Sequence, residues 1–202
     1  MLVIEKKRKP KIQKIPPHLI YEEMNGKPLY YKGYKAVLSG KKNLSEIMGC
    51  SSLQSVLVSI LHGYIFNLIN RKKYLLGSNE AGLHLSLNEN LASDIAIFEK
   101  DKIVLDDKYF TVAPKVVIEV DIKIDLAETE WNNEIEYLLD KSQKLLDFGV
   151  ERIIWITTKA KKIFVITPSD KWYIVNYQED IQVLDDCILN IARLLEEEGI
   201  VV

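Results

Sequence analysis

The spacing of apolar residues predicts three helices, and a further short helix is expected in NLSEIMG, capped by Asn43 or Ser45 and ended by Gly49. Between residues 51 and 70, leucine, isoleucine and valine recur every three or four positions, which is the spacing of a largely buried helix. A second, amphipathic helix is expected from Asn133 to Phe148, with Gly149 as its natural stop. A third is expected in CILNIARLLEEEGI at the C-terminus, closed by Gly199.

Apolar runs between these helices predict strands. Asn25-Gly26 is a strong turn signal among tyrosines and aliphatic residues, so residues 21–38 are predicted to form a hairpin. KYLLG, LHLSL and LASDIAIF follow as three β runs, and residues 103–112 are expected to form a hairpin or a loop. RIIWITT, KKIFVIT and KWYIVNY are joined by turns short enough for a meander. This order predicts an α+β or mixed α/β fold, in which helices flank a mixed β-sheet.

The length and charge of the chain set limits on its organisation. The 202 residues suit a single domain over residues 21–202, preceded by an arm over residues 1–20 that holds basic residues from Lys6 to Lys14 and three prolines. A solvated arm is favoured over a phosphate-contacting arm or a dimer strap. The net charge of −2 argues against a uniformly basic nucleic-acid binder but leaves room for a local basic patch.

The cysteines and the apolar runs indicate the compartment. Cys50 and Cys187 lie far apart without a nearby His/Cys cluster, so neither a zinc site nor a disulfide framework is indicated, and a reducing cytoplasm is expected. The apolar runs are too short or too interrupted for a membrane span of about 20 residues.

Ionisable residues occupy the most apolar β runs. Asp94 lies in SDIAIF, while Glu119, Asp121 and Lys123 alternate with valine and isoleucine at the end of PKVVIEVDIK. Successive strand side chains point to opposite faces, so these last three are expected to project the same way. Charged groups beside such runs are costly unless they are paired, hydrated or metal-bound.

Two interpretations of these charges stay open from their spacing alone. If Asp94 and Glu119 meet at one sheet edge, their oxygens suit Mg²⁺ or Mn²⁺, and a nearby lysine completes the minimum set for metal-assisted phosphodiester hydrolysis. Alternatively, the charges block pairing at an exposed edge strand. His62 and His84 are interpreted as packing or surface residues rather than ligands.

The order of the motifs resembles the Uma two family of restriction endonuclease-like proteins, within the PD-(D/E)XK nuclease-like superfamily. Asp94 and Glu119 match the two acids of that family, and Lys141 matches a helical lysine that stands in for the usual strand lysine. FGVE at residues 148–151 and Trp155 match the segment that follows. The likeness covers roughly residues 20–200 and implies a restriction-endonuclease-like core.

Further upstream the match is less regular. Tyr21-Glu22 through Gly26 resembles the opening of the family, which makes Glu22 a candidate supporting acid. Ser93 replaces the usual proline before the first acid, and Gln54 stands where the family often has a histidine at the start of its long helix.

Two lysines are candidates for the predicted site, according to how the motif is aligned. In one alignment, Glu119 works with Lys141; in the other, Asp121 and Lys123 read as the D-x-K pair of the superfamily. Both alignments keep Asp94 and Glu119, and Lys141 is slightly favoured.

The resemblance implies a divalent-metal-dependent endonuclease that acts on DNA, with Mg²⁺ or Mn²⁺ as the cofactor and a homodimer as an expected assembly. The alternatives are a catalytically inactive nuclease-fold module that binds nucleic acid or protein, and a homo-oligomeric structural protein. The residues that these expectations single out are the catalytic candidates Asp94, Glu119, Lys141, Lys123 and Glu22, the metal ligands Asp94, Glu119 and Asp121, and the phosphate contacts Lys72 and Lys73.

Overall fold

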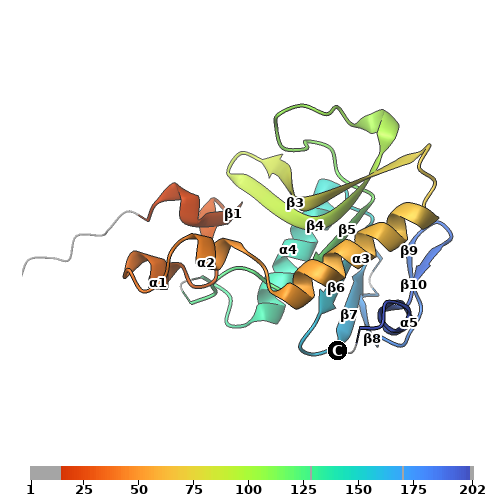
Figure 1. Cartoon of the computed structure of the whole chain (residues 1–202). Coiled ribbons are helices and arrows are strands. Elements are labelled where there is room, and N and C mark those ends of the chain that lie inside the picture. The colour runs from red at the N-terminus through yellow and green to blue at the C-terminus, as the bar shows by residue number, and fades with distance from the viewer. Residues whose placement is uncertain (1–14, 128, 170, 201–202) are drawn as a thin grey trace, which may run out of the picture.

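A mixed β-sheet forms the centre of the molecule (Figure 1). The computed structural model describes residues 15–127, 129–169 and 171–200, and the basic run from Lys6 to Lys14 lies outside them. Within that part, seven strands follow the order β2-β1-β4-β5-β6-β7-β8, and an eighth, β3, pairs with β4. The strands are β1 (Ile20–Met24), β2 (Lys27–Tyr30), β3 (Tyr74–Ser86), β4 (Glu89–Glu99), β5 (Val116–Val120), β6 (Arg152–Thr157), β7 (Lys162–Ile166) and β8 (Tyr173–Asn176).

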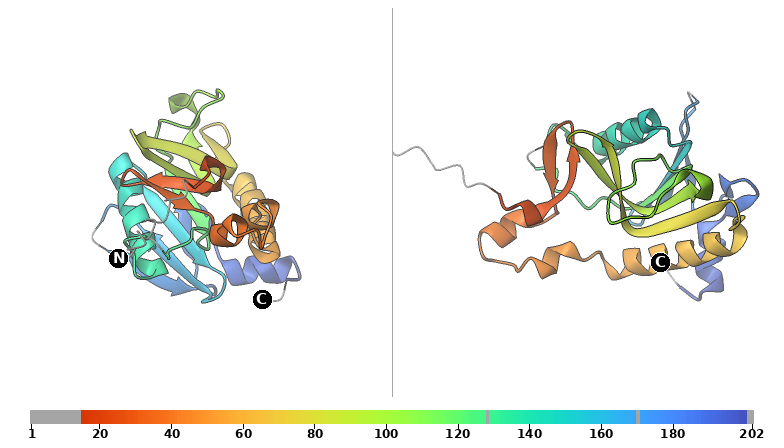
Figure 2. Two further views of the ribbon diagram at one scale, coloured as in Figure 1. Left: turned by 90° about the vertical axis from the view of Figure 1, so that its left-hand side faces the viewer. Right: turned by 90° about the horizontal axis from the view of Figure 1, so that it is seen from above.

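Helices cover both faces of this sheet, as the sequence predicts. α3 (Ser52–Leu68) packs on one face through Leu57, Leu61 and Ile65, together with α5 (Ile191–Glu197) and the small hairpin of β9 (Ile181–Leu184) and β10 (Cys187–Leu189). α4 (Glu134–Phe148) packs on the other face. The two views of Figure 2 show α3 and α4 on opposite sides of the strands. Across the described residues, no helix is long and apolar enough to cross a membrane.

The centre of the sheet is its most apolar part. β5 and β6 run parallel, with Val116 beside Arg152 and Val120 beside Ile156, and α4 makes the crossover between them. All five residues of β5 are buried, because helices cover both faces of this strand. β6, β7 and β8 form the predicted antiparallel meander.

Capping residues and a glycine set the ends of the two long helices. The Ser51 side chain accepts a hydrogen bond from the Gln54 amide at the start of α3, and Asn133 caps α4 in the same way. Gly149, at φ 116°, ends α4 in the left-handed region. Both predicted helices are therefore confirmed to within about two residues.

The buried face of α4 differs from the prediction. Apolar spacing puts Ile135 and Leu139 on that face, yet both are exposed. The buried positions include the polar Lys141 and Ser142 instead, because each has a partner inside; Trp155 Nε1 donates to Ser142 Oγ at 2.9 Å.

Three boundaries are corrected by the structure. Asn25 and Gly26 make the predicted turn at φ 54° and 67°, but β2 ends at Tyr30 and the short helix α1 (Tyr34–Leu38) follows. α2 (Ser45–Met48) confirms the short helix predicted in NLSEIMG. KYLLG and LHLSL belong to one strand, β3, and the C-terminal apolar run divides into β10 and α5. Leu19 is fully buried and Ile15 packs against the same cluster, so part of the expected arm, residues 1–20, belongs to the packed structure.

Candidate acid–lysine site

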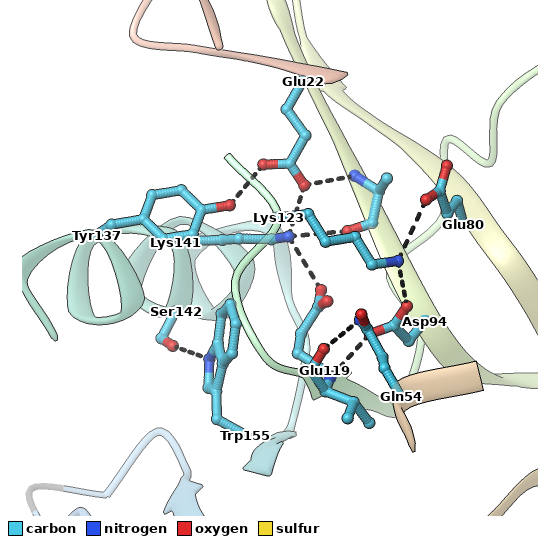
Figure 3. A network of polar contacts seen from close by, with 12 residues as sticks. Glu22, Gln54, Glu80, Asp94, Glu119, Lys123, Tyr137, Lys141, Ser142 and Trp155 are labelled. Atoms are coloured by element: carbon cyan, nitrogen blue, oxygen red, sulfur yellow. Dashed lines mark hydrogen bonds and ion pairs between the residues drawn. The ribbon is translucent and has the colours of Figure 1, made fainter. Parts of the chain in front are cut away.

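Two neighbouring strands bring the two predicted acids together. β4 and β5 are antiparallel, with Ile95 opposite Ile118, so Asp94 and Glu119 occupy the next facing positions (Figure 3). Asp94 Oδ2 accepts a hydrogen bond from the Val120 amide at 2.8 Å. Both carboxyl groups are buried, in the interior of the sheet rather than at an exposed edge strand.

Asp121 leaves the site because β5 ends one residue earlier. The backbone of Asp121 adopts a left-handed conformation, φ 57°, and this breaks the alternation. The prediction that Glu119, Asp121 and Lys123 project the same way from a strand is therefore wrong. The Asp121 carboxylate instead accepts hydrogen bonds from the Thr158 amide and hydroxyl, at 2.8 and 2.6 Å.

The predicted three-acid metal set is accordingly not assembled. Of the residues that the structure describes, no group of three or more His, Cys, Asp and Glu side chains is arranged to hold a metal ion. Asp94 and Glu119 remain as the two carboxylates that share one position on the sheet.

Lys123 returns to the acids from the loop after β5. Its Nζ lies 2.7 Å from Asp94 Oδ1 and 3.2 Å from Glu80 Oε1. Burial lowers the pKa of Lys123, but the negative charges of Asp94 and Glu80 outweigh it, so the pKa is raised. The ammonium is therefore charged at neutral pH, and 15% of the side chain remains exposed.

Lys141, on α4, contacts a different pair of acids, Glu22 and Glu119. Its Nζ lies 2.6 Å from Glu22 Oε1 and 3.0 Å from Glu119 Oε1, and donates to the Ala92 carbonyl at 2.8 Å. Tyr137 donates to the second Glu22 oxygen at 2.7 Å. Burial opposes the charge on Lys141, but Glu119 and Glu22 outweigh it and raise its pKa. Only 1% of this side chain is exposed, so Lys141 supports the acids from inside.

Glu119 carries an excess of neighbouring negative charge. Burial raises its pKa to about 8; Lys141 opposes this rise, and Asp94 and Glu22 add to it. Its Oε1 touches Lys141 but accepts no well-directed hydrogen bond from the described residues. A buried carboxyl group in this state would be relieved by an added cation.

A cavity of about 500 Å³ opens beside Asp94. Asp94, Glu80 and Lys123 line it, whereas Glu119 and Lys141 are absent from its described lining. The polar residues Ser55, Ser59 and His62 of α3 line another wall. Gln54 also lines the cavity and donates to the Val120 carbonyl at 2.5 Å, at the position where the resembled family often has a histidine.

Glu80 is a site residue that the sequence analysis missed. The pairing of β3 with β4 shifts by one residue between Ser78 and Ala81, and Asn79 and Glu80 both have positive φ, 64° and 58°. This β-bulge turns Glu80 toward Lys123, and bulges of this kind often re-aim side chains beside active sites. The one available signal was the polar Ser78–Glu80 segment between two apolar β runs.

The predicted phosphate contacts lie elsewhere. Lys72 and Lys73 follow the C-terminal end of α3, whereas Gln54 lies in its first turn and the cavity lining on α3 extends as far as His62. The rise of the helix from Gln54 to its last residue, Leu68, is about 21 Å. Lys73 Nζ stands over the Tyr74 ring, 4.9 Å from its centroid.

Comparison with known proteins identifies the fold. No protein-family model matches the chain, and a search of curated proteins found no match. The crystal structure of a "putative nuclease belonging to DUF820" from Anabaena variabilis is similar to this structure with a TM-score of 0.65, at 14% sequence identity, over 87% of this chain and 89% of that one. The chain thus has the α+β fold of that protein, and the expectation of a nuclease-like fold is confirmed.

Proposed function

We propose that this protein is a divalent-metal-dependent endonuclease that hydrolyses phosphodiester bonds in DNA. The observation that carries the proposal is the pair of carboxyl groups, Asp94 and Glu119, on neighbouring strands with a cavity-facing lysine, Lys123, beside them. The fold shared with the protein described as a "putative nuclease" supports it. So do the motifs that resemble the Uma two family.

The residues present fit Mg²⁺ or Mn²⁺. Both ions prefer oxygen ligands and typically use one or two carboxylates, completed by water and substrate phosphate. Asp94 and Glu119 would supply those carboxylates. Burial raises the pKa of Glu119, with the negative charges of Asp94 and Glu22 adding to the rise, and a bound cation would favour the ionised carboxylate. When bound, the ion supplies Lewis-acid activation of water and phosphate.

The two lysines have different roles in this proposal. Lys123 lines the cavity and is charged, so it stabilises the negative charge that builds on the phosphate rather than removing a proton. Lys141 is buried between Glu22 and Glu119 and holds the Glu119 carboxyl in position. The D-x-K lysine thus contacts the substrate, and the helical lysine is a positioning residue.

Plasmid cleavage tests the proposal. Supercoiled DNA incubated with Mg²⁺ or Mn²⁺ should be nicked or linearised by the wild type, and Glu119→Gln and Asp94→Asn should each reduce the rate at least a hundredfold. Asp147→Asn is the matched control, because Asp147 is an exposed acid on α4. Folded wild-type protein that cleaves no DNA with either ion would contradict the proposal.

A second candidate is a nuclease-fold module that binds nucleic acid without cutting it. The favouring observation is the position of Lys123, whose ammonium lies 2.7 Å from Asp94 and 3.2 Å from Glu80 and can balance the charge of these acids itself. Calorimetric titration with Mn²⁺ separates the two candidates. If the wild type binds Mn²⁺ and the Glu119→Gln variant does not, the result supports the nuclease. If the folded wild type binds no Mn²⁺, the result favours the binding module.

A further inference from the structure

We propose that Lys32 and Lys42 form a contact surface for the DNA backbone beside the acid site, an inference that rests on the proposed function. A second hollow, of about 230 Å³, is lined by Lys32, Lys42 and Lys123. It shares Gln54, Lys123 and the 48–50 segment with the main cavity. The two hollows therefore form adjoining surfaces, and Lys123 contributes to both.

The backbone ties this surface directly to the site. The Lys32 amide donates to the Lys123 carbonyl at 2.8 Å, and Tyr31 pairs with Ile124 in an isolated antiparallel bridge. Figures 1 and 2 show α1 and α2 beyond the N-terminal end of α3, on the side where β1 and β2 lie. A phosphate bound by Lys32 would thus belong to a strand that also reaches Lys123.

The surrounding segment is basic in a chain that is slightly acidic overall. Residues 27–50 contain five lysines and one acidic residue, Glu46, while the net charge of the whole chain is −2. Glu46 also lines the hollow, and its carboxylate accepts a hydrogen bond from the Asn43 amide. This local positive charge suits a polyanion, whose phosphates release counterions when lysines neutralise them.

The partners of these lysines are weak competitors for a phosphate. Lys32 Nζ lies 3.4 Å from Glu134, and both side chains are more than half exposed, so this pair contributes little free energy. Lys42 is exposed at the rim of the hollow. A phosphate diester can therefore approach both ammonium groups.

Lys72 and Lys73 provide a matched comparison. They are also two exposed lysines, but they lie beyond the far end of α3. Replacing either pair by alanine changes the net charge by the same amount. A difference between the two double variants therefore reports the position of the lysines rather than the total charge.

The experiment measures DNA affinity by fluorescence anisotropy across a salt series. Each double variant, Lys32→Ala/Lys42→Ala and Lys72→Ala/Lys73→Ala, is made in the Glu119→Gln background so that cleavage does not interfere. We expect the Lys32/Lys42 variant to bind roughly tenfold more weakly at 0.1 M salt and its log–log salt slope to fall by about 1.8, or 0.9 per phosphate contact. The Lys72/Lys73 variant should keep the parental slope. Thermal unfolding confirms that all proteins are folded.

The outcomes separate this inference from the proposed function. Three results would overturn the proposed surface. They are equal salt slopes for the two double variants, a larger change of slope in the Lys72/Lys73 variant, and no DNA binding by the parent Glu119→Gln protein at low salt. Plasmid cleavage by the wild type is scored separately. If the wild type does not cleave DNA but the salt slopes differ as expected, the nuclease proposal is wrong and the Lys32/Lys42 surface stands. If the wild type cleaves DNA but the two double variants have equal salt slopes, the surface is wrong and the nuclease proposal stands.

Discussion

Glu119 and Lys141 illustrate how burial sets the chemistry of this site. A carboxyl group without solvent is easier to protonate, and Asp94 and Glu22 add negative charge around it. Glu119 and Glu22 in turn hold Lys141 in the charged form. The site therefore contains more acid than its two lysines balance, which is the condition that favours binding of a cation.

The raised pKa of Glu119 has a consequence for stability in the absence of metal. Its folded value of about 8 exceeds the ordinary value of 4.5, so the folded state binds more protons between these pH values. The stabilisation from the protonated carboxyl is complete below pH 4.5 and is lost as the pH rises through 8. Glu119→Gln cannot ionise and should not show this loss.

Urea unfolding in EDTA at several pH values measures the difference. Relative to the wild type, Glu119→Gln should become more stable between pH 5 and pH 9, by an amount on the order of a few kcal/mol. Stability curves that stay parallel across this range would show that Glu119 is ionised throughout.

The two lysines should respond differently to loss of charge. Lys141→Met leaves Glu22 and Glu119 buried without their cation and should cost about 3–5 kcal/mol in the free energy of unfolding. Lys123→Met removes a partly exposed group and should reduce the cleavage rate at least tenfold with a much smaller loss of stability. Urea unfolding and plasmid cleavage, measured on both variants, check this division. An active, stable Lys141→Met protein would contradict it.

Strand ends decide which side chains reach the site. β5 stops at Val120, and the left-handed turn at Asp121 sends its carboxylate to Thr158 while Lys123 comes back to Asp94. The bulge in β3 similarly delivers Glu80. These irregularities account for both the loss of a predicted acid and the gain of an unpredicted one.

Asp121→Asn tests the position of the strand end. Because the Asp121 oxygens are bonded to Thr158, the substitution should leave metal-dependent cleavage within about threefold of the wild type. Its effect should appear instead as a loss of about 1–2 kcal/mol in stability, from weaker bonds to the threonine. A loss of Mn²⁺ affinity comparable to that of Asp94→Asn would return Asp121 to the metal site.

The sequence predicted the regular elements better than their irregular joins. Apolar spacing, Asn133 and Gly149 were sufficient for α4, and the turn residues for the β6–β8 meander. Periodicity alone could not predict that Lys141 would be buried, since that depends on two carboxylates from distant strands. Nor does an alternating D-I-K segment show where its strand ends.

Distances across the molecule were also beyond the sequence. Arg71, Lys72 and Lys73 are adjacent basic residues and so attract attention, but they follow the end of α3, which lies about 21 Å along the helix from Gln54. Of the two lysines in the adjoining hollow, Lys32 belongs to the segment that was expected to form a hairpin, residues 21–38, and Lys42 follows that segment. A cluster of basic residues can be assigned to the site only when the fold shows how far it lies from the acids.

The sheet and its two helical layers converge on one position. β1 supplies Glu22, β4 supplies Asp94, β5 supplies Glu119 and α4 supplies Lys141, all from segments far apart in the chain. α3 closes this position from the other face through Gln54. The account therefore depends on a cation binding where β4 and β5 meet.

A crystal structure with Mn²⁺, read from its anomalous signal, tests this dependence most directly. The expected result is one ion with oxygens of both Asp94 and Glu119 within about 2.0–2.6 Å, and with the Asp121 carboxylate still on Thr158. The account would be contradicted if crystals saturated with Mn²⁺ showed no ion at Asp94 and Glu119. It would also be contradicted if an ion bound elsewhere in the cavity without contacting these two carboxylates.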